Sequence, residues 1–254
     1  MFAVGEGVTN VKVGDQVITH PGWWDPEDPV AQESGDGTLS NTMKIWGYET
    51  TWGSFGQFAK AKAHQCLPKP KRLTWEAAAF YMLVGSTAYR MLTGWAPHTV
   101  RSGDVVLVWG GAGGLGSIAI QLIKEMDGKS VVVVSSKERG EYCLELGSAG
   151  YLLRGDYDHW SQLPAWDNDE AYGAWLKGAK AFGRDLWDAV GERKSPQIVF
   201  EHPGEDTLPT SVFVCDTGGM IVICAGTSGY NGTLDLRYQS MRQKRLQASP
   251  AASN

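Results

Sequence analysis

Closely spaced glycines at residues 111–116 are the clearest chemical feature of this 254-residue sequence. The run Gly-Ala-Gly-Gly-Leu-Gly fits the pattern G-x-G-x-x-G. Bare backbone lets N–H groups approach the pyrophosphate of a dinucleotide, and the N-terminus of a following helix adds its positive dipole end. The alternative is a merely tight strand-to-helix turn. The residues expected to contact the cofactor here are Gly111, Gly113, Gly114, Leu115 and Gly116.

The elements around these glycines favour the dinucleotide site. Residues 105–109 form an apolar, β-branched run that predicts a buried strand, and residues 117–123 continue at helical spacing. A second apolar run, 131–134, follows one helix length later. Strand, glycine turn, helix and strand complete a βαβ unit, which is the context that the motif requires.

The end of the second strand indicates which dinucleotide binds. An NAD site usually carries Asp or Glu there for the ribose 2′-hydroxyl, whereas this strand runs into Ser135, Ser136 and Lys137. Hydroxyls and cations suit a 2′-phosphate, so we expect NADPH to be preferred over NADH. Arg139 would help if its helix turn faces the ribose. The alternative is an ordinary helix start with serine as the N-cap.

Composition narrows the class of protein. The chain is 43% hydrophobic and 20% charged, with a net charge of −5, which is typical of a globular protein and argues against nucleic-acid or membrane-surface partners. It has no apolar stretch long enough to span a membrane and no basic leader, so a cytoplasmic location is expected. The four cysteines lack C-x-x-C spacing, which predicts reduced thiols and no metal site.

The remaining pattern predicts two regions. Residues 1–20 look like a strand pair around a Gly-Asp turn, 21–43 like a long loop, and 44–62 like strands of a partial β-barrel. Two helices are expected, at 75–79 and 86–92. From there strands and helices alternate, which predicts an α/β fold with a doubly wound parallel sheet. The expected later elements are helices 138–146 and 170–191 and strands 149–153, 198–201, 218–226 and 244–247.

Several strings together resemble the crotonyl-CoA carboxylase/reductase family, within the medium-chain dehydrogenase/reductase superfamily, and the related reductase domain of propionyl-CoA synthase. Besides the glycine turn they are residues 45–50 (Ile-Trp-Gly-Tyr-Glu-Thr), 73–78 (Leu-Thr-Trp-Glu-Ala-Ala), 87–92 (Thr-Ala-Tyr-Arg-Met-Leu), 199–204 (Val-Phe-Glu-His-Pro-Gly) and 241–245 (Met-Arg-Gln-Lys-Arg).

The resemblance implies a partial GroES-like catalytic domain over residues 1–97 and a Rossmann domain over 98–254, with no zinc and with homo-oligomeric relatives. It also implies that NADPH passes a hydride to the β-carbon of an α,β-unsaturated acyl-CoA, and that carbon dioxide or a proton traps the enolate. Family members extend beyond both ends of this sequence, so a chain truncated at both ends is expected. A simple enoyl or quinone reductase, and an inactive NADP-binding remnant, are the alternatives.

The resemblance also places the carbon dioxide pocket, which in carboxylating members consists of Asn, Phe, Glu and His. Glu49 matches the Glu, and Tyr48 stands where the Phe does. The Asn belongs to a segment before residue 1, and Pro250 stands where the His is expected. Proline has no imidazole and no backbone donor, so carboxylation is doubtful in this chain. A strand-edge carboxylate is the alternative role for Glu49.

Four further residues are assigned through the family. Thr87 corresponds to a position lining the nicotinamide pocket, although a buried helix-cap hydroxyl would look the same. His202 follows a strand and is expected near the cofactor, with a plain turn histidine as the alternative. Arg237 and Tyr238 correspond to an Arg-Tyr pair that contacts the adenine end of CoA.

Overall fold

A computed structural model describes residues 1–249 of the chain. Contacts divide these residues into two compact units, 1–87 and 88–249, which are described separately below. Helix α2 (Trp75–Thr93) contributes residues to both units. The predicted domain boundary between residues 97 and 98 stays a prediction.

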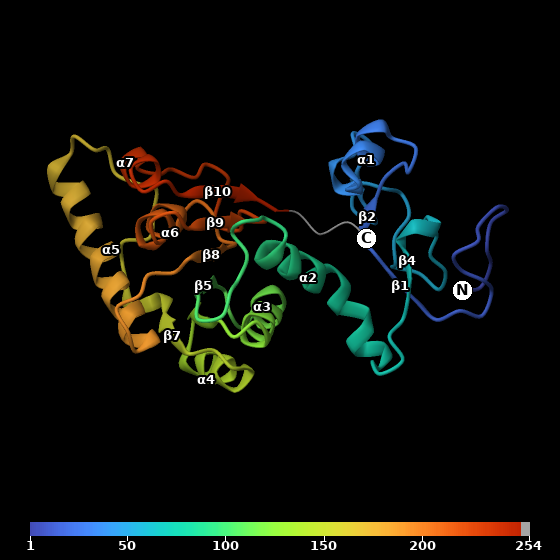
Figure 1. Cartoon of the computed structure of the whole chain (residues 1–254), viewed down its shortest axis with the longest axis horizontal. Coiled ribbons are helices and arrows are strands. Elements are labelled where there is room, and N and C mark those ends of the chain that lie inside the picture. The colour runs from blue at the N-terminus through green and yellow to red at the C-terminus, as the bar shows by residue number, and fades with distance from the viewer. Residues whose placement is uncertain (250–254) are drawn as a thin grey trace. The chain divides into compact units, whose positions relative to one another are not determined.

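The unit 88–249 is built on a six-stranded, wholly parallel sheet with the order β10-β9-β8-β5-β6-β7 (Figure 1). The first strand of the sheet, β5, lies in its middle. The chain then adds β6 and β7 on one side of β5 and returns to add β8, β9 and β10 on the other side. This arrangement confirms the doubly wound α/β fold. The strands are β5 (Val105–Trp109), β6 (Lys129–Val134), β7 (Gly150–Leu153), β8 (Ile198–Glu201), β9 (Met220–Ile223) and β10 (Arg245–Ala248).

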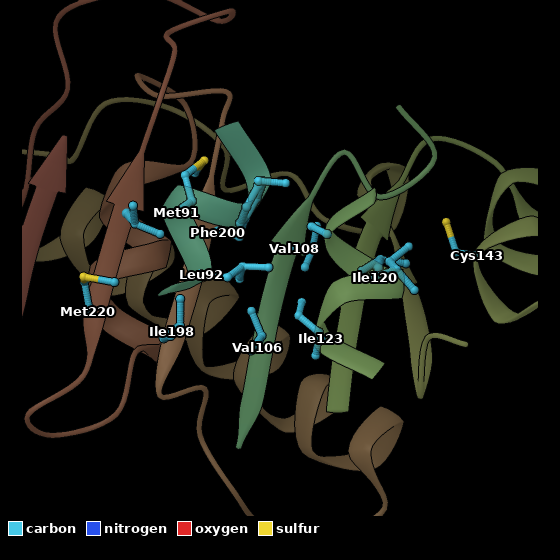
Figure 2. Packing of buried hydrophobic residues seen from close by; sticks show 14 of the residues in the cluster. Met91, Leu92, Val106, Val108, Ile120, Ile123, Cys143, Ile198, Phe200 and Met220 are labelled. Atoms are coloured by element: carbon cyan, nitrogen blue, oxygen red, sulfur yellow. The ribbon is translucent and has the colours of Figure 1, made fainter. Parts of the chain in front are cut away.

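Helices cover both faces of this sheet. Side chains alternate along each strand, so Val106 and Val108 pack with α2, α3 and α4 (Figure 2). Leu107 packs on the opposite face with α5 and α6. Both faces of the sheet are buried at β5, which explains why this strand is apolar along its whole length. The helices are α3 (Gly114–Glu125), α4 (Lys137–Leu146), α5 (Asp169–Val190), α6 (Leu208–Val214) and α7 (Leu236–Ser240), with the 3₁₀ turn η3 (Arg154–Asp156).

Helix α5 shows how local sequence sets an element's limits. Asn168 accepts a hydrogen bond from the backbone N–H of Ala171 at its start, and Gly191, with φ of 79°, ends it in the left-handed conformation. Phe182 and Leu186 on its apolar face are buried against the sheet. The predicted helix is confirmed within one residue at each end.

The unit 1–87 has much less regular structure. Its strands form two small antiparallel pairs, β1 with β4 and β2 with β3. The elements are β1 (Val17–Thr19), β2 (Gly22–Trp23), α1 (Pro29–Ser34), η1 (Gly37–Leu39), β3 (Lys44–Ile45), η2 (Ala63–Gln65) and β4 (Cys66–Pro68).

Several expectations for this half are wrong. Only β1 is a strand within residues 1–20, and it pairs with β4 instead of with the segment before the Gly-Asp turn. Residues 44–62 contribute only the two-residue strand β3. Their aromatic side chains do not alternate onto a buried face: Phe55 and Phe58 are both exposed.

The helices of this half also differ from expectation. The predicted loop 21–43 contains α1, which Asp28 caps through the N–H groups of Val30 and Ala31, with Pro29 in the first turn. The two short helices expected at 75–79 and 86–92 are one continuous helix, α2. Gly85 lies within it, because a single glycine costs a helix only about 1 kcal/mol.

Among residues 1–249, no helix combines the length and apolar character needed to cross a membrane.

Candidate functional site

The glycine turn joins β5 to α3 at the carboxyl edge of the sheet. Gly110 has φ of 69°, and a Cβ atom added to Gly111 would stand 2.5 Å from the Cβ of Val132. A Cβ added to Gly116 would stand 2.5 Å from the carbonyl oxygen of Gly110. Glycine at these positions therefore lets the helix start against the strands and leaves bare backbone at its N-terminus. The first N–H groups of a helix lack intrahelical partners, so this turn fits a pyrophosphate.

A pocket of about 310 Å³ opens beside this turn, entirely within the unit 88–249. Parallel strands end at one edge of a sheet, and this pocket collects residues from or just after β5, β6, β7, β8 and β9. It lies where the strand order reverses, between β5 and β8, as expected for a dinucleotide site. Its lining consists of Trp109, Gly110, Ala112, Gly113, Val133, Val134, Ser135, Arg139, Arg154, His202, Pro203 and Thr227.

Hydroxyl and guanidinium groups gather at the β6 side of this pocket. Arg139 donates from Nη1 to Oγ of Ser135 at 3.2 Å, so the two residues form one positively charged corner. Arg154 lies in the same lining and pairs with Asp206 at 3.4 Å. This corner fits the 2′-phosphate of NADPH, since arginine donors match phosphate oxygens in geometry.

The two other residues predicted here have different surroundings. Ser136 is the N-cap of α4, and its Oγ accepts from the N–H of Arg139 at 3.3 Å. Lys137 is exposed in the first turn of α4 and, within the part of the chain described, lies outside the pocket lining. A role in cofactor binding stays a prediction for both.

The loop after β8 forms the opposite wall. His202 lines the pocket, and burial lowers the pKa of its imidazole, which favours the neutral ring. Immediately before it, Glu201 is completely buried. Burial raises the pKa of Glu201, while hydrogen bonds from Ser211, Thr207 and two backbone N–H groups oppose that shift.

A second pocket, of about 450 Å³, lies at the amino-terminal ends of β8, β9 and β10, and Tyr238 lines it. Asp216 is the one carboxylate in a lining that is otherwise strongly basic. Lys244 is buried and donates from Nζ to the carbonyl of Val212 at 2.6 Å. The cations of this pocket are Lys180, Arg184, Arg193, Arg242 and Lys244.

Arg237, the other half of the predicted Arg-Tyr pair, binds a carboxylate of its own unit. It forms an ion pair with Asp235 at 2.6 Å, and its guanidinium lowers the pKa of Asp235 to about 2. Tyr172 donates its hydroxyl to the same carboxylate at 2.6 Å. The ion pair with Asp235 therefore holds Arg237 beside Tyr238, which lines the second pocket.

The remaining candidates belong to the unit 1–87. Tyr48 is exposed, and Oε2 of Glu49 accepts the N–H of Ile45 at 2.7 Å. Thr87 is buried in α2 and donates its hydroxyl to the carbonyl of Leu83 at 2.8 Å. These contacts place the residues without testing their predicted roles. Pro250 lies outside the described residues.

The sequence analysis did not single out three residues at or next to this pocket: Arg154, Glu201 and Thr227. Arg154 follows β7 directly, Glu201 is the last residue of β8, and Thr227 lies beyond the end of β9. Their positions at or after the ends of predicted strands could have indicated them, because polar residues at the ends of parallel strands meet at one edge of the sheet even when they are distant in sequence.

No group of three or more His, Cys, Asp and Glu side chains within residues 1–249 is arranged to hold a metal ion.

Comparison with known families matches two segments. The family model described as zinc-binding dehydrogenase matches residues 114–253, and the alcohol dehydrogenase GroES-like domain matches residues 2–71. The second match confirms the GroES-like assignment.

Individual relatives confirm the resemblance seen in the sequence. The crotonyl-CoA carboxylase/reductase of Cereibacter sphaeroides is 47% identical over 253 residues, covering 100% of this chain and 58% of that protein. A solved structure of the crotonyl-CoA carboxylase/reductase AntE in complex with NADP has a TM-score of 0.96 and 53% identity, over 99% of this chain and 62% of that one. The 2-octenoyl-CoA carboxylase reductase CinF, solved with NADP and 2-octenoyl-CoA, has a TM-score of 0.83 and 37% identity, over 95% and 52%. The chain thus spans less than two thirds of the length of these relatives.

Proposed function

The chain belongs to the zinc-binding dehydrogenase family, and from this premise we propose that it is an NADPH-dependent reductase of α,β-unsaturated acyl-CoA thioesters. One observation carries the proposal: the glycine turn and the Ser135–Arg139 corner converge on a single pocket at the carboxyl edge of the sheet. Relatives solved with NADP, and one solved with 2-octenoyl-CoA, support the choice of cofactor and substrate class.

The residues of the chain hold the cofactor at its two anionic groups, the pyrophosphate and the 2′-phosphate. Backbone N–H groups of the glycine turn bind the pyrophosphate. Ser135, Arg139 and Arg154 bind the 2′-phosphate, and exchanging that phosphate for a hydroxyl leaves Arg139 without an anionic partner, whereas Arg154 keeps its ion pair with Asp206. Preference for NADPH over NADH follows from this loss.

Reduction requires a hydride at the β-carbon and a proton at the α-carbon. When bound at the glycine turn and the Ser135–Arg139 corner, NADPH would supply this hydride and would be oxidised to NADP⁺. The electron pair of the substrate C=C bond moves toward the thioester carbonyl as an enolate, and a proton from solvent completes the saturated acyl-CoA, so atoms and charge balance.

The basic pocket at Tyr238 binds the nucleotide end of CoA in this proposal. CoA carries phosphates, and five cations against one carboxylate favour such an anion. Arg237 assists from its position beside Tyr238, where Asp235 holds it.

We further propose that the enolate is protonated more often than it is carboxylated. Carbon dioxide is apolar and binds weakly, so trapping with it needs several placed polar groups. Glu49 is one such group, but Pro250 stands where the family has histidine. Loss of one donor at a site of developing charge costs about 10²–10³ in rate.

Product analysis tests the proposal. Crotonyl-CoA and NADPH are incubated with the protein in bicarbonate buffer, and the acyl-CoA products are separated by chromatography and identified by mass spectrometry. We expect butyryl-CoA as the main product. Ethylmalonyl-CoA as the main product would overturn the protonation step, and turnover of a simple quinone instead of the thioester would overturn the substrate class. NADPH binding without any turnover would support an inactive NADP-binding protein.

A further inference from the structure

We propose that Glu201 is a positioning residue that fixes two walls of the cofactor pocket against each other. The inference rests on the proposed cofactor function of that pocket. Glu201 touches neither substrate nor cofactor, since its side chain is completely buried at the end of β8.

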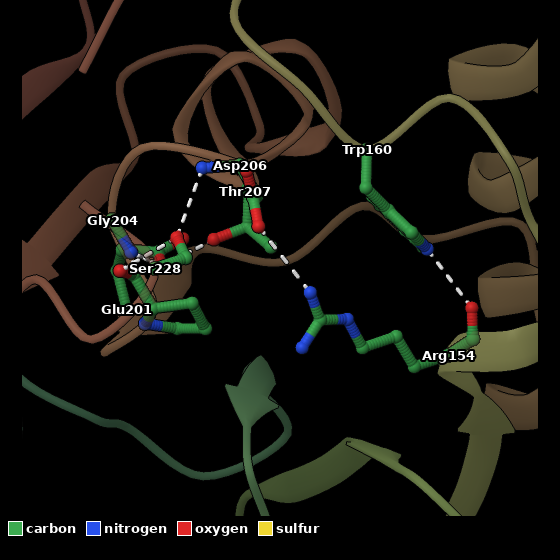
Figure 3. A network of polar contacts seen from close by, with 8 residues as sticks. Arg154, Trp160, Glu201, Gly204, Asp206, Thr207 and Ser228 are labelled. Carbon is green, nitrogen blue, oxygen red and sulfur yellow. Dashed lines mark hydrogen bonds and ion pairs between the residues drawn. The ribbon is translucent and has the colours of Figure 1, made fainter. Parts of the chain in front are cut away.

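One carboxylate oxygen of Glu201 holds the loop that follows it (Figure 3). Oε1 accepts the N–H groups of His202 and Gly204, both at 3.1 Å, and the hydroxyl of Thr207 at 2.7 Å. His202 and Pro203 line the pocket, so these three donors define the shape of that wall.

The other oxygen reaches the strand that leads into the glycine turn. Oε2 accepts the hydroxyl of Ser211, and Oγ of Ser211 accepts the indole N–H of Trp109 at 2.8 Å. Trp109 is the last residue of β5 and lines the pocket directly before the turn. Glu201, acting through Ser211, therefore ties the β5 wall to the β8 wall.

The loop beyond β9 is attached to the same frame (Figure 3). Oγ of Ser228 donates to the carbonyl of Pro203 at 3.0 Å and accepts the N–H of Asp206, also at 3.0 Å. A Cβ added to Gly204 would stand 3.0 Å from Cα of Gly226, so the two loops touch through their backbones. Thr227, in the pocket lining, lies between these contacts.

The donor set is specific for a carboxylate. All four groups that face Glu201 donate, and its two carboxyl oxygens accept all four hydrogen bonds. Glutamine at this position would keep one acceptor oxygen and replace the other by an N–H₂ group. That group would face either the three donors that bind Oε1 or the hydroxyl of Ser211, so one of the two walls would lose the hydrogen bonds that the carboxylate accepts from it.

The test compares four variants with the wild-type chain. Glu201→Gln breaks the donor pattern at constant size. Thr207→Val removes one hydroxyl at nearly constant shape, and Thr207→Ser restores it. Ser148→Ala is the matched control: it removes a buried hydroxyl that donates to the carbonyls of Ser130 and Gly150, at the opposite edge of the sheet.

Two readouts are measured on folded protein: the Kd for NADPH by nicotinamide fluorescence, and amide hydrogen exchange without cofactor. We expect Glu201→Gln to weaken NADPH binding about tenfold, equal to about 1.4 kcal/mol, and Thr207→Val to weaken it severalfold. Thr207→Ser and Ser148→Ala should bind NADPH like the wild type. Exchange should accelerate in residues 202–207 of Glu201→Gln and not throughout the sheet.

An unchanged Kd in Glu201→Gln, together with a general loss of stability, would show a merely structural role and overturn the inference. Should Glu201→Gln fail to fold, the Thr207→Val and Thr207→Ser pair decides by the same criteria. If the wild type itself does not bind NADPH, the proposed function fails. The exchange measurement then still decides whether Glu201 orders the loop.

Discussion

The two units of this chain differ in how they bury apolar side chains. In the unit 88–249, strands and helices enclose two clusters in which Phe200 and Phe182 have no exposed surface. In the unit 1–87, strands of two or three residues leave Phe55 and Phe58 exposed. The pocket at the glycine turn lies within the unit that is built around a sheet.

The two units also differ in how they hold the residues predicted to bind cofactor or take part in catalysis. The pocket at the glycine turn assembles its lining from five strand ends, all held by one sheet. Tyr48 and Glu49 instead lie in a segment with little regular structure around them. Cofactor binding should therefore respond sharply to single substitutions within residues 88–249 and weakly to changes in residues 1–87.

The largest expected difference concerns stability. Phe200→Ala should reduce the free energy of unfolding by about 3–5 kcal/mol, because it removes a fully buried aromatic side chain and leaves a cavity. Phe55→Ala should change it by less than about 0.5 kcal/mol. Urea unfolding followed by circular dichroism measures both. Equal losses for the two variants would contradict the comparison.

The next largest expected effect concerns the selectivity of the pocket in the unit 88–249 for NADPH over NADH. Arg139→Glu should weaken NADPH binding about ten- to a hundredfold, because a charge-assisted hydrogen bond is worth about 1.5–3 kcal/mol, and should leave NADH binding nearly unchanged. Lys137→Glu, outside the lining, should weaken NADPH binding less.

A matched charge reversal in the other unit provides the control for that measurement. Arg72→Glu changes the net charge by the same amount as Arg139→Glu, at an exposed position within residues 1–87. Fluorescence titration with NADPH and NADH should show no change in selectivity for Arg72→Glu. A similar loss in both variants would point to overall charge instead of a local 2′-phosphate contact.

The glycine turn offers a smaller effect with a built-in control. Gly116→Ala places a Cβ against the carbonyl oxygen of Gly110, which is backbone and yields poorly, so we expect a loss of about 1–3 kcal/mol in stability. Gly173, in α5, has open space around its Cα, so Gly173→Ala should be neutral or stabilising. Thermal melts of the two variants make the comparison, and a stable Gly116→Ala would refute close packing at the turn.

The sheet was predictable from sequence, and the surroundings of the site only in part. Strand β5 lies between two helical layers and is apolar throughout, so its pattern survives without tertiary information. Helix α1 was missed because it is short, although Asp28 and Pro29 are ordinary start signals. Glu201 was missed for another reason: its partners Ser211 and Trp109 come from different elements, and only the folded sheet brings them together.

The smallest expected effect is a pH dependence of the unit 88–249. His159 is buried among the rings of Tyr157, Trp160 and Phe182, and within the described residues neither of its ring nitrogens has a hydrogen-bond partner. Burial lowers the pKa of His159 below its ordinary value of 6.5. The unfolded chain therefore binds a proton that the folded unit excludes, and stability falls as the pH drops below about 6.5.

One such proton contributes at most about 1.4 kcal/mol per pH unit. Replacing the imidazole by a ring that cannot titrate, in His159→Phe, should flatten the acid side of the stability curve of this unit. His64, in the unit 1–87, has its pKa lowered to about 4, first by burial and then by Lys62 and His20, so His64→Phe should act on the other unit. Urea unfolding between about pH 7 and pH 5, with hydrogen exchange to assign each transition, separates the two histidines. If His159→Phe leaves the acid slope of the sheet unit unchanged, the aromatic cluster accommodates the charged ring and the prediction is wrong.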